Sequence, residues 1–366
     1  METQRQATLN AARQAGFRNV SLLNEPTAAA IAYGGVIDQQ CTVMVFDFGG
    51  GTLDITIMKV EGREEYRMLT TDGNMYLGGE DFDNEIVQYF LEDIEKKTGH
   101  NLSEDNKARA LLKLVAEQAK IALSNDIPRY HETVYSLEAL FGIQYEAELT
   151  KETFQGMFQG LLKKILEPVK GALEATQLTV KDIDRVILVG GSSKLPAVKS
   201  TLEKFFGRSN VVCADANPDE AIAHGAAIQS YRLNNGQPSN FQEVTAYPYG
   251  IEVLHRNWLW RTTRIAELIP RGQPYPYKTT ECFETAYDNQ TAVTFQIYQS
   301  KRGFHVDKFR IGLFTIPNLP KRMKGECQFE LTYDIDRNNI LHATTQGRNN
   351  IADYKKNLDI QLDNIA

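Results

Sequence analysis

The stretch "VMVFDFGGGTLDITIM", residues 43–58, places three consecutive glycines between two apolar runs. The first run, "TVMVF", has the pattern of a short buried strand, and apolar residues at every second position from Leu53 are typical of another strand. Together they predict a β-hairpin with glycines 49–51 at its tip, to which "EYRMLTTDG" adds a third strand. An aspartate, Asp47 or Asp54, stands on each shoulder of the tip.

This hairpin tip has the composition of a phosphate-binding turn. Glycines lack Cβ atoms and tolerate positive φ, so successive N–H groups in Gly49, Gly50, Gly51 and Thr52 can converge on an anion. The flanking aspartates would repel a phosphate. They therefore indicate a Mg²⁺ ion with its waters, or a monovalent cation, between acids and phosphate.

A second glycine turn lies in "DRVILVGGSSKLPAVKS", where a buried strand is followed by Gly190, Gly191 and Ser192 and then by a helix that begins near Lys194. Exposed N–H groups at such a helix start also bind anions. Neither turn has the Walker Gly-Lys-Ser/Thr pattern or the dinucleotide GxGxxG pattern. A single glycine cluster is often only a tight hairpin, whereas two such turns in one α/β region favour nucleotide or phosphate binding.

Composition excludes several classes of protein. The 366 residues carry a net charge of −7, which argues against a general nucleic-acid or anionic-membrane surface. No apolar run approaches the roughly 20 residues of a membrane span. The four cysteines lie far apart and indicate reduced thiols rather than a disulfide framework. We expect a soluble, cytoplasmic protein with no nucleic-acid or membrane partner.

The chain changes character after Leu233. Before it, helices are expected at 3–16, 80–98, 103–124, 150–176 and 217–233, with a hairpin at 130–149. The stretch "NNGQPSNFQE" resembles a linker. From residue 244, short β-type runs alternate with Asn, Asp, Gly and Pro turns, which predicts a β-sandwich.

Several motifs, in their order along the chain, resemble those of the 70-kDa heat-shock chaperone family. They are "NEPTAAAIAYG" (24–34), "FDFGGGTLDITI" (46–57), "LGGEDFDN" (77–84), "AEQAKIALS" (116–124), "VILVGGSSKLP" (186–196), "NPDEAIAHGAA" (217–227), "AYDNQTAVTFQIYQ" (286–299) and "LTYDIDRNNILHAT" (331–344).

This resemblance implies an α/β actin-like ATPase domain, represented mainly by its second lobe, followed by an all-β sandwich that binds peptides. The expected domains are a remnant of the first nucleotide-binding lobe at 1–36, the second lobe at 37–233, a linker at 234–243 and the sandwich at 244–366. The family joins its domains by an acidic, leucine-containing linker, whereas "SNFQE" (239–243) stands here. Only Phe241 can dock in that way, so weak coupling is expected.

The resemblance also assigns a nucleotide site for ATP or ADP with Mg²⁺, and K⁺ as a further cation. It implies that Asp47 and Asp54 organise the metal ion, and with Thr52 and Glu25 they form the catalytic side. The family commonly has an arginine that stacks on the base where Ile121 stands here, which removes a cation–π contact. The residues expected to contact nucleotide are Gly49, Gly50, Gly51, Thr52, Gly79, Glu80, Glu117, Lys120, Ser124, Gly190, Gly191, Ser192, Lys194 and Asp219.

Two family features are absent from these 366 residues: the first phosphate loop, "DLGTT", and a catalytic lysine. The sequence opens inside a helix that the family reaches far along its chain, so an N-terminally truncated member is expected. Phosphoryl transfer depends on charges positioned around the γ-phosphate, and the loss of one such donor commonly costs about 10²–10³ in rate. Impaired ATP hydrolysis is expected, and whether the chain is an enzyme stays open.

The sandwich is expected to hold an extended peptide through main-chain hydrogen bonds and an apolar pocket. The positions that match the family's cleft are Leu254, Ala286, Val293 and Phe295. In the loop "HRNWLWRTTR" (255–264), tryptophans 258 and 260 can cap the cleft, and arginines 256, 261 and 264 add charge. No helical lid follows, so fast peptide release is expected.

The sequence thus predicts a heat-shock-type chaperone that assists folding by binding extended hydrophobic peptides, with J-domain cochaperones and nucleotide-exchange factors as further partners. Two alternatives stay open. One is a non-catalytic interaction or scaffold module derived from such a chaperone, and the other is an incomplete gene model of a normal one.

Overall fold

The computed structural model describes residues 2–33, 40–62, 65–125, 127–213, 217–237, 241–256, 261–300, 304, 308–348, 351 and 354–359. Several predictions from the sequence concern residues outside this set. Trp258 and Trp260, linker positions 238–240 and the end of the predicted 1–36 segment lie outside these residues, as do the side chains of Arg256 and Arg261.

The described chain forms two compact units. Asn24–Phe241 make an α/β unit, and Met1–Leu23 together with Gln242–Ala366 make a β unit. The structure therefore divides the predicted 1–36 segment at Leu23, and the predicted helix at its start belongs with the β unit. The strand β8 (Phe241–Gln242) spans the boundary between the units.

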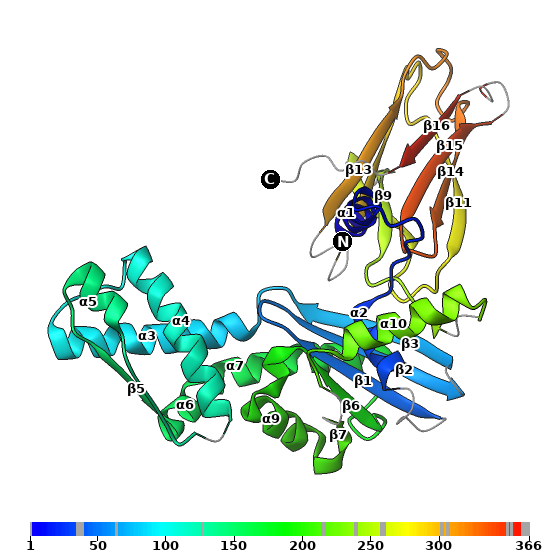
Figure 1. Cartoon of the computed structure of the whole chain (residues 1–366). Coiled ribbons are helices and arrows are strands. Elements are labelled where there is room, and N and C mark those ends of the chain that lie inside the picture. Colours follow the sequence, from blue (N-terminus) through cyan, green and yellow to red (C-terminus); the bar gives the residue numbers. More distant parts are fainter. Residues whose placement is uncertain are drawn as a thin grey trace. The chain divides into compact units, whose positions relative to one another are not determined.

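A twisted mixed sheet is the centre of the α/β unit (Figure 1). The strands of this sheet that lie wholly in the unit follow the order β7-β6-β1-β2-β3, with β1 antiparallel to β2 and parallel to β6. Residues 43–48 are buried without alternation, so both faces of β1 are covered. The strands are β1 (Cys41–Phe48), β2 (Leu53–Gly62), β3 (Glu65–Asn74), β6 (Arg185–Val189) and β7 (Val212–Cys213).

Helices cover this sheet. The helix α2 (Glu25–Ala32) contacts β1 and β6 and packs on α10 (Ala221–Asn234), and α8 (Leu166–Thr176) contacts β2 and β3. After β6, a short 3-10 turn η1 (Gly191–Lys194) leads into α9 (Pro196–Phe206), and η2 (Ser209–Val211) precedes β7.

An outer subdomain, residues 79–164, extends from the sheet. It contains α3 (Gly79–Thr98), α4 (Asn106–Ser124), α5 (Tyr135–Phe141), α6 (Lys151–Met157), α7 (Gln159–Lys164) and a two-stranded ribbon of β4 (Arg129–Thr133) and β5 (Glu146–Thr150). Buried side chains of this subdomain and of the sheet belong to one apolar cluster. The subdomain is therefore packed onto the sheet.

The predicted helix at 150–176 is wrong in its continuity. The segment forms three helices, α6, α7 and α8, separated at Phe158 and Ile165. Two glycines lower the helix propensity near the first break, and Pro168 cannot donate a backbone hydrogen bond to the turn before it. The predicted hairpin at 130–149 is present as β4 and β5, with α5 inserted between its strands.

The β unit is a two-sheet structure with a core between the sheets. One sheet has the order β10-β9-β12-β13, and the other has the order β11-β14-β15-β16. The strands are β9 (Tyr249–Arg256), β10 (Arg261–Ile269), β11 (Tyr277–Glu284), β12 (Val293–Gln299), β13 (Phe309–Ile316), β14 (Gln328–Ile335), β15 (Leu341–Gly347) and β16 (Lys355–Asp359). In β14 every second residue from Phe329 is buried, as expected for a strand with one face on a core.

The helix α1 (Glu2–Gln14) belongs to the same unit. Arg5 donates a hydrogen bond of 3.2 Å to the carbonyl oxygen of Asn338, and the Leu22 N–H donates one of 3.1 Å to the Asn338 side chain. Leu9 is buried. These contacts connect the N-terminal segment to the β14–β15 turn. Among the described helices, none combines the length and the apolar character that a membrane crossing requires.

Gly225 sets the distance between α10 and α2. A Cβ atom at this position would lie 1.7 Å from the Ala28 carbonyl oxygen, which belongs to the backbone of α2. Gly225→Ala should therefore lower the free energy of unfolding by about 1–3 kcal/mol, as overpacked substitutions do. Denaturant unfolding of both proteins measures this change.

Gly160→Ala is the matched control, because its added Cβ meets no atom within 4 Å. The same substitution in an open helical position should be neutral or stabilise by about 0.5–1 kcal/mol. Equal stabilities for the two variants would contradict the close helix contact.

Candidate nucleotide site

The glycine turn between β1 and β2 is held by its carbonyl groups. The Gly49 oxygen accepts hydrogen bonds from the Gly79 N–H at 3.0 Å and from the Ser192 hydroxyl at 2.8 Å. The Gly50 oxygen accepts one from the Glu80 N–H at 2.8 Å. The start of α3 and the turn after β6 thus fix the hairpin tip from two sides.

These hydrogen bonds require a residue without a side chain at position 79. A Cβ atom there would lie 2.2 Å from the Ser192 hydroxyl oxygen, which is the atom that holds the Gly49 carbonyl. At the preceding Gly78, a Cβ atom would lie 2.2 Å from the Gly50 carbonyl oxygen. The pair of glycines in "LGGEDFDN" therefore permits the close approach of two backbones.

Most amide groups of the turn, unlike its carbonyl groups, have no hydrogen-bond partner among the described residues. The Gly49 N–H donates to the Thr52 carbonyl at 3.0 Å. Within the described residues, the N–H groups of Gly50, Gly51 and Thr52 have no recorded acceptor. The space beside Gly50 and Gly51 is open, since a Cβ atom on either residue would meet nothing within 4 Å. Fixed carbonyls and free amides are the arrangement that an anion-binding turn needs.

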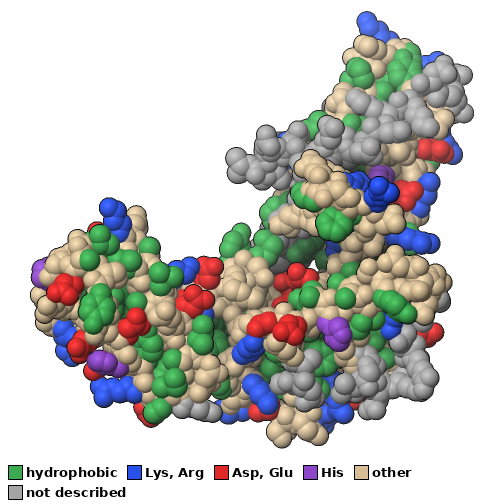
Figure 2. Space-filling view, in the orientation of Figure 1, with side chains coloured by type: hydrophobic (Ala, Val, Ile, Leu, Met, Phe, Trp, Pro, Cys, Tyr) green, Lys and Arg blue, Asp and Glu red, His purple; other side chains and the backbone are tan. Residues whose placement is uncertain are grey.

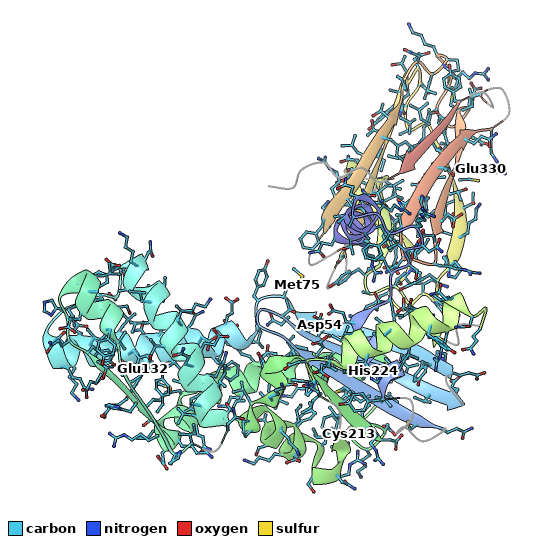
Figure 3. All side chains as sticks on the ribbon, viewed as in Figure 1. Asp54, Met75, Glu132, Cys213, His224 and Glu330 are labelled. Atoms are coloured by element: carbon cyan, nitrogen blue, oxygen red, sulfur yellow. The ribbon has the colours of Figure 1, made fainter. Side chains whose placement is uncertain are left out.

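Asp47 and Asp54 are direct cross-strand partners in the β1–β2 pair, beside this turn. Figure 3 labels Asp54 on the central sheet. Burial raises the pKa of Asp47 to about 7, with further contributions from the nearby charges of Glu25 and Asp54. Burial and the charge of Glu25 likewise raise the pKa of Asp54. A hydrogen bond from the Thr52 hydroxyl partly offsets this rise. Three carboxylates thus lie close enough to influence one another near the amino-terminal end of α2.

This acidic cluster fits a hydrated cation. Like charges that raise one another's pKa are stabilised by a positive ion between them. Glu25, Asp47 and Asp54 do not form a group whose ligand atoms all lie within 4.8 Å of one another. Carboxylates spaced in this way leave room for the waters that a hydrated cation keeps.

A cavity of about 530 Å³ lies beside the turn, within the α/β unit. One wall is a single face of α4, because Glu117, Lys120, Ile121 and Ser124 follow the i, i+3, i+4, i+7 spacing. The remaining lining residues come from the hairpin tip, the start of α3, the segment after β6 and the approach to α10. They are Gly50, Gly79, Glu80, Asp83, Asn125, Gly191, Ser192, Lys194, Leu195 and Asp219.

Lys120 and Asp83 form an ion pair at the base of this wall. The Lys120 Nζ lies 2.8 Å from the Asp83 carboxylate and donates to the Gly79 carbonyl at 3.2 Å. Both side chains are largely buried, with 13% and 5% of their surfaces exposed. Burial raises the pKa of Asp83, which Lys120 partly offsets. The pair therefore ties α4 to the start of α3.

Two exposed ion pairs border the cavity. Lys113 and Glu80 approach to 2.7 Å, and Lys113 holds the pKa of Glu80 below its usual value. Lys194 pairs with Asp219. The Gly190 N–H donates to the Pro218 carbonyl at 3.1 Å, which joins the turn after β6 to the segment before α10.

The structure brings the predicted nucleotide residues together. Ten of the fourteen line the cavity, and Gly49, Gly51, Thr52 and Gly190 lie in the turns that border it. Asp83, Asn125 and Leu195 also line the cavity and are not among the predicted residues. Asp83 could have been found from its spacing, since it stands four residues after Gly79 and one helical turn after Glu80.

The β unit holds a second cavity, of about 690 Å³. All four predicted cleft residues line it, with Phe295 buried and Leu254 43% exposed. Both sheets contribute, and charged side chains border the apolar part. The other lining residues are Ile251, Glu252, Val253, Cys282, Phe283, Glu284, Thr285, Gln290, Thr294, Lys324, Gln328 and Arg348.

An α/β unit with a cavity beside two glycine turns, and a two-sheet β unit with its own cavity, define a protein with two separate candidate binding sites. The family model described as Hsp70 protein matches residues 1–364. The chain belongs to the Hsp70 family, whose members are chaperones that bind nucleotide with magnesium and unfolded peptides.

The raised pKa of Asp47 predicts a pH-dependent cost to stability. The native state keeps this proton up to about pH 7, whereas the unfolded chain releases it near 3.8. Stability from this group therefore falls as the pH rises between those values. Asp47→Asn should match the wild type near pH 4 and exceed it above pH 7 by roughly 2–4 kcal/mol.

Urea unfolding of both proteins in magnesium-free buffer measures this difference. Glu104→Gln, which removes an exposed carboxylate, is the control and should show no such pH-dependent gain. A constant difference between Asp47→Asn and wild type across the pH range would contradict the buried acidic cluster.

Proposed function

We propose that the α/β unit binds an adenine nucleotide with Mg²⁺, the phosphates at residues 49–52 and the nucleoside in the cavity along α4. The single observation that carries this proposal is the hairpin tip, where Gly79, Glu80 and Ser192 bind the carbonyls of Gly49 and Gly50 while the N–H groups of residues 50–52 have no acceptor among the described residues. Amides fixed in this way need little reorganisation to meet an anion.

The chain's own residues divide the ligand between them. Glu117 and Ser124 offer polar groups to a ribose, and Ile121, 54% exposed, offers an apolar surface to a base. The amides of Gly50 and Gly51 would donate to phosphate oxygens. A bound Mg²⁺ would neutralise phosphate charge, and Asp47 and Asp54 would hold its waters.

The proposal concerns binding rather than hydrolysis. Phosphoryl transfer requires positive charge and a positioned nucleophile around the γ-phosphate. The described residues supply one phosphate turn and the acidic cluster. No stretch of the family's "DLGTT" type stands among the 366 residues.

We propose further that the β unit binds extended hydrophobic peptides in its own cavity. Val293, Phe295 and Ala286 supply an apolar lining, and the exposed Leu254 stands at its border. An extended segment can add main-chain hydrogen bonds to such a pocket. This combination supports the chaperone function of the family for this chain.

Gly51→Val tests the phosphate turn. A Cβ atom at this position would meet no atom within 4 Å and the backbone φ is not positive, so the fold should be retained. The branched side chain would occupy open space at the turn, where the proposed phosphate would approach. We expect affinity for Mg-ADP to fall at least about tenfold, or 1.4 kcal/mol, while affinity for adenosine is unchanged.

Calorimetry with both ligands measures this effect, and Gly156→Val, also in open space, is the control. No binding of Mg-ADP to the wild-type protein at millimolar concentration would remove nucleotide from the account. That result would favour the non-catalytic interaction module instead.

Val293→Phe tests the peptide cavity, because the larger ring would fill space between the two sheets. Fluorescence anisotropy with a labelled, leucine-rich peptide should show at least about a tenfold loss of affinity. Met323→Phe enlarges an exposed side chain that does not line the cavity, and it should bind as the wild type does. Equal affinity in all three proteins would place the peptide elsewhere.

A further inference from the structure

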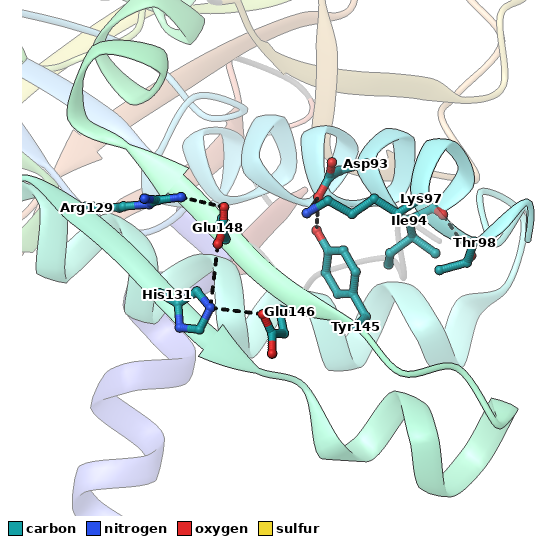
Figure 4. A network of polar contacts seen from close by, with 9 residues as sticks. All are labelled: Asp93, Ile94, Lys97, Thr98, Arg129, His131, Tyr145, Glu146 and Glu148. Atoms are coloured by element: carbon teal, nitrogen blue, oxygen red, sulfur yellow. Dashed lines mark hydrogen bonds and ion pairs between the residues drawn. The ribbon is translucent and has the colours of Figure 1, made fainter.

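The β4–β5 ribbon carries a cluster of possible metal ligands, apart from both cavities. His131 on β4 stands directly opposite Glu148 on β5, and Glu146 lies two residues before it on the same face. The side chains of Ala147 and Leu149, on the other face of β5, are buried. The three polar side chains are therefore displayed together toward solvent (Figure 4).

The donor atoms of this cluster already converge. The His131 Nε2 lies 3.2 Å from a Glu146 carboxylate oxygen and 3.6 Å from the Glu148 Oε1. One ligand atom from each residue lies within 4.8 Å of the other two. In a tetrahedral zinc site with bonds of about 2.0–2.1 Å, neighbouring donor atoms are about 3.3 Å apart. The two observed separations match that edge.

Arg129 orients one of these ligands. Its guanidinium donates to the Glu148 Oε2 at 2.6 Å, which leaves the other oxygen, Oε1, on the side of His131. Outer hydrogen bonds of this kind commonly hold metal-binding carboxylates in place.

The charges around the ribbon suit a divalent ion. Two carboxylates outweigh the single charge of Arg129, and Lys97, the other cation near Glu148, is engaged by Asp93 at 2.8 Å. Figure 2 shows histidine side chains among acidic and basic ones on the surface of the α/β unit. One imidazole with two carboxylates is a donor set that zinc accepts.

We propose that His131, Glu146 and Glu148 form a Zn²⁺-binding site that joins β4 to β5, with water at the open coordination positions. Such an ion would cross-link β4 and β5, which pair with each other along only five residue pairs. The site is independent of the nucleotide and peptide proposals, and either can fail without affecting it.

The experiment combines a zinc titration with diffraction. Crystals soaked in zinc chloride, measured at the zinc absorption edge, should show an anomalous peak bounded by His131 and the two glutamates. Calorimetry with Zn²⁺, in saturating Mg²⁺ to fill the acidic cluster near Asp47, should show one site in the wild type. His131→Gln and Glu146→Gln should weaken that site at least about tenfold.

The matched control is His100→Gln, which removes an exposed histidine of the same subdomain that is not part of the cluster. Its zinc titration should equal that of the wild type. The absence of a peak at the ribbon, or equal titrations in wild type and His131→Gln, would overturn the proposal. The three side chains would then form only the polar contacts of His131 with the two glutamates.

Discussion

The α/β unit depends on the tethering of one hairpin tip by its own carbonyl groups. Gly49 and Gly50 each lend a carbonyl oxygen to neighbouring elements, and the donors come from the start of α3 and from Ser192. Since carbonyls and amides of a turn face different directions, fixing the first group also orients the second. The geometry of the candidate site is therefore a consequence of how three connections pack.

The same packing concentrates negative charge. The β1–β2 register places Asp47 opposite Asp54, and the start of α2 adds Glu25, so that burial and mutual repulsion raise the pKa of Asp47 to about 7. A protein that keeps such a cluster loses stability at neutral pH unless a cation is present. The loss of stability and the proposed cation site both arise from the same buried carboxylates. A measurement of stability therefore also tests the cation site.

Much of this site could be predicted from the sequence, because its parts are local. A few neighbouring residues are enough to predict the glycine turns, the alternation in β2 and the helical spacing of Glu117, Lys120 and Ser124. The resemblance to the family then predicted that these parts form one site. Long-range contacts were harder. The pairing of Asp83 with Lys120 and the placement of α1 in the β unit depend on packing between distant segments. The breaks in 150–176 were missed because helical periodicity continues across them.

The central claim is that the free amides of the hairpin tip bind phosphate, and amide chemical shifts test it most directly. In ¹⁵N-labelled protein with Mg²⁺, ADP should move the amide signals of Gly50, Gly51 and Thr52, together with signals from α4. Adenosine should move the α4 signals and leave the three tip amides unchanged. Tip signals that respond equally to both ligands, or to neither, would contradict the account.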